Sequence, residues 1–178
     1  MQLKLPTPAD VTNVTVLVRV DYNVPTSTDS AGVITIESDE RIVASLETLR
    51  FLLENNAKIV LVAHFGRPEG PNDMRFTLAP IATALSKLLN TPVQLLTTAS
   101  DPETKAAIQS SAPKSVFLLE NIRFDKREES NDPQLAQELA ALADIYINEA
   151  FSASHRSHAS IVGVPTILPA FAGLGLAR

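Results

Sequence analysis

The 178-residue sequence has no cysteine, few glycines and no long apolar run, and each shortage removes a class of protein. Without cysteine there is no disulfide scaffold, no cysteine-ligated zinc site and no thiol nucleophile. The six glycines form neither a G-x-x-x-x-G-K-[ST] nor a G-x-G-x-x-G motif, so no cradle for a nucleotide is recognisable. No apolar run approaches the roughly 18–20 residues of a membrane span, and the first residues lack the apolar core of a signal peptide. We therefore expect a cytoplasmic protein with no membrane contact.

Positive charge is also in short supply. The chain has 15 Lys and Arg against 20 Asp and Glu, which gives a net charge of −5. Sequence-independent binders of nucleic acid are normally basic, so we expect no nucleic-acid partner. Hydrophobic residues make up 45% of the chain, which excludes global disorder. The length corresponds to one domain, at about 100–200 residues per domain.

Apolar runs and helical periods alternate along the chain. Five short runs have the continuous apolar character of strands covered on both faces of a sheet: 14–21, 57–63, 93–96, 116–120 and 145–148. Four intervening segments carry apolar residues three or four apart, or helix-start signals, and predict helices: 39–55, 78–90, 101–110 and 132–143. The alternation predicts an α/β fold, namely a Rossmann-like three-layer α/β/α sandwich with a mainly parallel sheet.

The segments outside this alternation carry separate expectations. Residues 25–32 are rich in turn formers and predict a loop, followed by a short strand over 33–36. Ser38 and Thr77 are the expected caps of the first two helices. The apolar stretch 164–175 has no compensating pattern, so we expect it to begin a further element or to meet a missing partner domain. The alternative is a C-terminal tail that packs on this domain.

Polar and basic side chains follow the ends of four predicted strands. In chain order they are Asp21, Asn23, His64, Gly66, Arg67, Asn121, Arg123, His155, Arg156 and His158. Because the carboxyl ends of parallel strands meet at one edge of a sheet, we expect these residues to converge there. Arginine presents a planar fork that matches carboxylate and phosphate groups. The sequence therefore predicts a pocket for a small, multiply charged anion.

Each of these residues also has a purely structural interpretation. Asp21 and Asn23 suit a turn, and His64 alone suits a histidine paired with backbone carbonyls. His155 and His158 are three residues apart, but no acidic residue or cysteine lies beside them at ligand spacing, so we predict no metal site. The charged run 125–129 suits a solvated loop. The convergence of four strand ends favours the anion pocket.

Five motifs in this sequence resemble the signatures of the phosphoglycerate kinase family, in the family's order and over nearly the whole chain. They are Val18–Pro25, Asp39–Ile42, His64–Pro68, Leu119–Phe124 and Phe151–Ser160. The resemblance identifies residues 1–178 as the N-terminal, substrate-binding domain of a two-domain kinase. The nucleotide-binding C-terminal domain of that family would be absent from this chain.

The resemblance also implies an activity. The complete enzyme would be a monomer and would act in glycolysis. It would transfer a phosphoryl group reversibly between Mg-ATP and the carboxylate of 3-phosphoglycerate. Asp21 and Asn23 would hold the glycerate, and Arg41 would lie nearest the transferred group and be catalytic. The other implied substrate-binding residues are His64, Gly66, Arg67, Arg123, His155 and Arg156. The chain alone would bind no nucleotide and would be inactive.

The sequence departs from the family pattern in the loop before Arg156. Ser152 stands where the family usually has glycine, so we expect strain or a reshaped loop if that position needs a positive φ. Two alternative functions stay open from the residues. Asp21-Tyr22-Asn23 loosely resembles the D-x-D loop of haloacid-dehalogenase-like phosphotransferases, and covalent phosphate on Asp21 would favour that class. The other is a stand-alone anion-binding domain without kinase activity.

Overall fold

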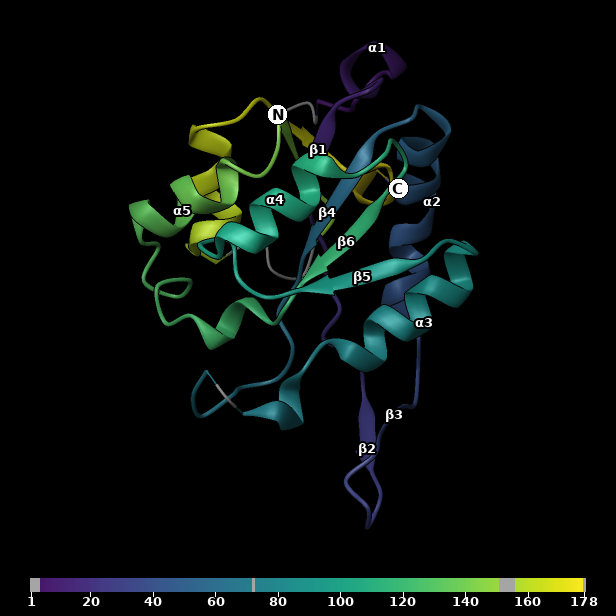
Figure 1. Cartoon of the computed structure of the whole chain (residues 1–178), viewed down its shortest axis with the longest axis vertical. Coiled ribbons are helices and arrows are strands. Elements are labelled where there is room, and N and C mark those ends of the chain that lie inside the picture. The colour runs from purple at the N-terminus through teal and green to yellow at the C-terminus, as the bar shows by residue number, and fades with distance from the viewer. Residues whose placement is uncertain (1–3, 72, 151–155, 178) are drawn as a thin grey trace.

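A six-stranded parallel sheet forms the centre of the computed structural model, which describes residues 4–71, 73–150 and 156–177 (Figure 1). The sheet has the order β5-β6-β4-β1-β7-β8, and every neighbouring pair is parallel. Its strands are β1 (Thr15–Arg19), β4 (Lys58–Val62), β5 (Val93–Leu96), β6 (Val116–Leu119), β7 (Ile145–Asn148) and β8 (Ala170–Ala172). The five predicted core strands and their parallel arrangement are confirmed.

Helices cover both faces of the sheet. The helices α2 (Glu40–Glu54) and α3 (Ala79–Leu89) lie on one side, and α4 (Pro102–Ser110) and α5 (Pro133–Ala140) lie on the other (Figure 1). Alternation along β1 divides the core, since Val16 and Val18 pack in the cluster that contains α2 and α3, whereas Leu17 packs with α4 and α5. The predicted three-layer α/β/α sandwich is confirmed.

The sixth strand, β8, comes from the apolar stretch 164–175. It pairs with β7, and Phe171 and Ala172 are 5% and 8% exposed. Its outer edge meets the N-terminal segment, because Ala172 N donates to the Lys4 carbonyl at 2.8 Å. The expectation that this stretch begins a further element is therefore wrong for Ala170–Ala172, which complete the sheet of this domain.

A small antiparallel hairpin stands apart from the main sheet (Figure 1). It pairs β2 (Thr26–Thr28) with β3 (Ile34–Ile36), so the short strand predicted over 33–36 is confirmed and the loop predicted over 25–32 is wrong at Thr26–Thr28. Asp29 Oδ1 closes the turn by accepting from Ala31 N and Val33 N, both at 2.9 Å. Pairing with β3 thus gives Thr26–Thr28 the extended backbone of a strand, although the composition of this segment indicates a turn.

Two predicted helix caps differ from the observed ones. The N-cap of α2 is Asp39 rather than Ser38, and the N-cap of α3 is Leu78 rather than Thr77. The helix α5 ends at Ala140, before the predicted residue 143. The shorter helical segments are Pro8–Val11 (α1), Met74–Phe76, Ile122–Phe124, Ala159–Gly163, Val164–Thr166 and Leu174–Ala177. Within the described ranges, no helix is long and apolar enough to cross a membrane.

Candidate functional site

The predicted site residues follow β1, β4, β6 and β7 at the carboxyl edge of the sheet, with Arg41 contributed by the first turn of α2. The Asp21 carboxylate forms an ion pair and hydrogen bond with Arg41. The Asp21 side chain is 14% exposed and that of Arg41 is 46% exposed, so the guanidinium lies at the surface while its carboxylate partner lies beneath it. The ion pair ties the start of α2 to the loop after β1.

The backbone of Gly66 is held from two sides. Asn23 Oδ1 accepts a hydrogen bond from Gly66 N at 2.9 Å, and Arg123 Nη1 donates to Gly66 O at 2.5 Å. Gly66 has φ +58°, and a Cβ at this position would lie 2.2 Å from the Phe76 ring. The loops after β1, β4 and β6 therefore meet at a residue that tolerates no side chain.

Asn121, which the sequence analysis expected at this edge but to which the family resemblance gave no role, connects the same loops. Its Oδ1 accepts from Phe65 N and Arg123 N, both at 3.1 Å. Its Nδ2 donates to Phe65 O at 2.7 Å and to Phe76 O at 2.9 Å. The side chain is 2% exposed and satisfies four backbone groups, so it fixes the approach of Arg123 to the loop after β4.

His64 is buried against Arg19, a second residue that the sequence analysis did not assign to the site. Arg19 Nη2 lies 3.0 Å from His64 Nδ1, and the two residues are 1% and 5% exposed. Burial, followed by the charges of Arg19 and Arg123, lowers the pKa of His64 from 6.5 to about 3. Burial likewise lowers the pKa of Arg19, and Glu128 opposes that effect. His64 is therefore a neutral imidazole in a positively charged environment.

The charged run 125–129 is not the solvated loop that its composition indicates. Glu128 is fully buried, with Oε1 accepting from Ser160 Oγ at 2.5 Å and Oε2 accepting from Ser160 N at 2.9 Å. Ser160 Oγ in turn accepts from Arg19 Nε at 2.8 Å. The Glu128 carboxylate of this loop thus points into the core, where Ser160 connects it to Arg19 of β1.

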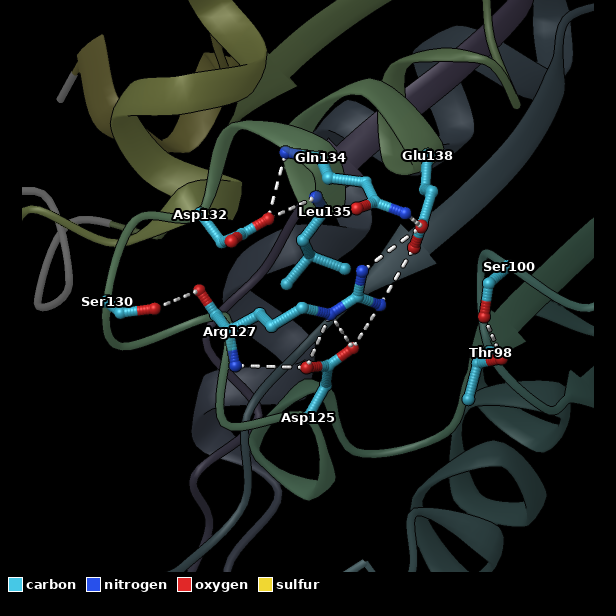
Figure 2. A network of polar contacts seen from close by, with 9 residues as sticks. All are labelled: Thr98, Ser100, Asp125, Arg127, Ser130, Asp132, Gln134, Leu135 and Glu138. Atoms are coloured by element: carbon cyan, nitrogen blue, oxygen red, sulfur yellow. Dashed lines mark hydrogen bonds and ion pairs between the residues drawn. The ribbon is translucent and has the colours of Figure 1, made fainter.

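Figure 2 shows how the rest of this loop is attached to α5. Arg127 lies between the carboxylates of Asp125 and Glu138, with ion-pair distances of 2.7 and 2.8 Å, and these partners raise its pKa. Asp132 Oδ1 caps α5 by accepting from Gln134 N and Leu135 N at 2.9 and 3.0 Å. The loop that carries Glu128 is therefore anchored on both sides.

At this edge of the sheet, arginine charges act on His64 and on one another. Burial is the main cause of the lowered pKa of Arg123, and the charge of Glu129 opposes it. The charges of Arg156 and Arg67 lower this pKa further. Arg156 also contributes to the lowered pKa of His64. The Arg123 side chain is 11% exposed, and its Nε is buried without a hydrogen-bond partner, 3.4 Å from Glu129 Oε1. Positive side chains that follow neighbouring strands favour an anionic ligand at this edge. His155 and Ser152 lie outside the described residues.

The described part of the chain holds no group of three or more His, Cys, Asp or Glu side chains that could bind a metal ion. The two histidines considered together at the sequence level cannot be compared, since His155 is not described. The described His158 has its Nδ1 3.7 Å from Glu128 Oε1.

The comparisons with known proteins agree with one another. The family model described as "Phosphoglycerate kinase" matches residues 7–178. A phosphoglycerate kinase from Desulforudis audaxviator is 47% identical over 169 residues, which are 95% of this chain and 42% of that protein. One from Herpetosiphon aurantiacus is 50% identical over 157 residues, covering 88% of this chain and 39% of that protein.

Solved structures give the same result. The phosphoglycerate kinase from Pyrococcus horikoshii matches 94% of this chain and 41% of its own, with a TM-score of 0.83 and 32% identity. That from Coxiella burnetii matches 94% of this chain and 40% of its own, with a TM-score of 0.79 and 36% identity. The chain thus spans about two fifths of the length of these relatives. By sequence and by fold, the chain belongs to the phosphoglycerate kinase family.

Proposed function

We propose that residues 1–178 are the N-terminal, 3-phosphoglycerate-binding domain of a monomeric, cytoplasmic phosphoglycerate kinase. The observation that supports the proposal is that a buried His64 and the basic residues Arg67, Arg123 and Arg156 all follow neighbouring parallel strands at one edge of the sheet, in a member of this family. The nucleotide-binding domain would be a separate, C-terminal unit. The family match gives no support to the haloacid-dehalogenase-like alternative.

The site residues take separate roles in this proposal. Asp21 and Asn23 hold the glycerate end of the substrate, and the arginines with His64, Gly66 and His155 surround its phosphate and neighbouring groups. Arg41 lies nearest the phosphoryl group in transfer. Its exposed guanidinium, anchored at the start of α2 by Asp21, is able to reach a group that arrives from outside the domain.

The chemistry explains the absence of a catalytic acid–base pair from this set. The attacking group is the carboxylate of 3-phosphoglycerate, which is ionised at neutral pH and needs no general base. The barrier lies in bringing two anions together and in stabilising the charge of the transferring phosphoryl group, which positioned cations do. Mg-ATP supplies the phosphoryl group in the complete enzyme. The described residues offer neither a metal-binding group nor a glycine-rich phosphate loop, so we assign none of them to it.

Calorimetric titration of the 178-residue chain with 3-phosphoglycerate tests the substrate assignment. Arg67→Ala and Arg123→Ala should each weaken binding about 10- to 100-fold, since each removes charge-assisted hydrogen bonds to the substrate. Arg50→Ala is the matched control, because Arg50 is exposed on α2 and its guanidinium donates to Leu88 O at 3.4 Å. Absence of binding to the folded chain would refute the substrate assignment.

Arg41→Ala should behave differently in a full-length enzyme that contains this chain. If its guanidinium meets charge mainly in the transition state, kcat should fall more than KM rises. Steady-state kinetics with varied 3-phosphoglycerate measures the split. A rise in KM with unchanged kcat would make Arg41 a substrate-binding residue instead.

A further inference from the structure

Two fully buried charges lie behind the site, and the proposed function gives neither a role. They are Arg19 of β1 and Glu128 of the loop after β6. Buried charges are tolerated when their hydrogen bonds are complete. Here Arg19 Nε donates to Ser160 Oγ, whose hydroxyl donates to Glu128 Oε1, while Glu128 Oε2 accepts from Ser160 N. These three residues are called the Arg19 relay below.

The relay ends on one ring nitrogen of His64. Arg19 Nη2 lies 3.0 Å from His64 Nδ1, and a second guanidinium nitrogen, Nη1, donates to the Val20 carbonyl. Because a guanidinium has donors and no acceptor, His64 Nδ1 must be the acceptor in this contact. The ring is then neutral and carries its proton on Nε2, a conclusion that rests on geometry alone.

The second ring nitrogen is available for a ligand. Among the described residues, His64 Nε2 makes no hydrogen bond, and it is not one of the two buried side-chain atoms without a partner, which are Arg123 Nε and Asn131 Oδ1. We propose, on the basis of the proposed function, that the Arg19 relay holds His64 as the neutral tautomer that donates from Nε2–H to the bound anion. Ser160 and Glu128 are positioning residues for that hydrogen bond.

The groups around His64 support this assignment. Arg19 of β1, Arg123 after β6 and Arg156 after β7 disfavour its protonation, and Asp21 after β1 is the acidic group that favours it. Burial acts in the same direction as the arginines, and the pKa is lowered to about 3. The site thus separates two tasks, since the arginines supply charge and His64 supplies a directed donor.

Nitrogen-15 NMR of the 178-residue chain reads the tautomer directly, with the His64→Gln spectrum assigning the ring signals. We expect a neutral Nε2–H ring that does not titrate between pH 5.5 and 8.5. A ring that is protonated on Nδ1, or that titrates near pH 6.5, would overturn the proposal. This readout needs no substrate, so a chain with the expected tautomer that fails to bind 3-phosphoglycerate would refute the proposed function instead.

Substitution at Ser160 tests the relay. Ser160→Ala should introduce the second tautomer or a titration in the same pH range, and should weaken 3-phosphoglycerate binding about 2- to 10-fold, the effect of one hydrogen bond. Ser160→Thr retains the hydroxyl and should restore both properties. Ser45→Ala is the control, because Ser45 is 2% exposed and its hydroxyl contacts Tyr22 and Ile42 on the opposite side of the sheet.

Two variants can refute the role of the Arg19 relay. A folded Ser160→Ala chain with the original tautomer and the original affinity would remove the relay from the site. If that variant does not fold, Glu128→Gln decides in its place, since it removes the carboxylate charge and keeps an acceptor. An unchanged His64 signal and an unchanged affinity for 3-phosphoglycerate in Glu128→Gln would likewise refute the role of the Arg19 relay.

Discussion

Gly66 occupies a backbone position that other residues fill only with strain. Its φ of +58° lies in the left-handed region, and the Phe76 ring leaves no space for a Cβ. We expect Gly66→Ala to lower the free energy of unfolding by about 1–3 kcal/mol in urea titrations. Gly70→Ala is the control, because nothing lies within 4 Å of the Cβ that it would add. Equal stability of the two variants would contradict this account of the loop.

The sequence indicated the candidate site residues that follow strands better than the charged residues buried behind them. Asp21, Asn23, His64 and Arg123 follow strands and could be predicted from topology. Glu128 could not, since a glutamate within a run of charges gives no sign that it turns inward. Arg19 did carry a signal, because a charge inside an otherwise apolar strand must find a partner in the core.

At the level of elements, the helices α2 and α5 both have an aspartate at the N-cap, but only one of the two side chains caps its helix. Asp132 accepts hydrogen bonds from Gln134 N and Leu135 N, whereas Asp39, the N-cap of α2, makes no side-chain cap hydrogen bond. Asp132→Ala should therefore reduce the free energy of unfolding by about 1 kcal/mol. Asp39→Ala should change it by less than about 0.5 kcal/mol. Urea titrations of both variants measure the difference, and a larger loss for Asp39→Ala would contradict the cap assignment.

Element type was predictable where a run was long and continuously apolar, as for β1 and β4. The three-residue strands were not: β2 lies in a segment rich in turn formers, and β8 lies in a stretch with two prolines. Both are strands because a partner is present, β3 for the hairpin and β7 for the sheet. A three-residue strand is too short to show a period, so the pattern of residues alone reveals neither of these strands.

On the scale of the whole molecule, the site depends on the sheet rather than on any one loop. The strands β1, β4, β6 and β7 are contiguous in the sheet, so their carboxyl ends present the loops side by side. A chain with a net charge of −5 thereby concentrates arginines at one edge. Binding at that edge should weaken as salt screens the partly exposed arginines.

In the proposed function, this chain binds 3-phosphoglycerate and a separate domain binds the nucleotide. This division determines the activity that we expect of the chain by itself. Its sequence contains no glycine-rich phosphate-binding motif, and the reaction proposed for the complete enzyme needs ATP to be held opposite 3-phosphoglycerate while the surrounding protein closes over both. We therefore expect binding of 3-phosphoglycerate without turnover, in a coupled assay that follows ATP-dependent formation of ADP. A full-length relative assayed in parallel controls for the assay. Robust turnover by the 178-residue chain would show that its own residues hold the nucleotide, and the assignment of that role to a separate domain would be wrong.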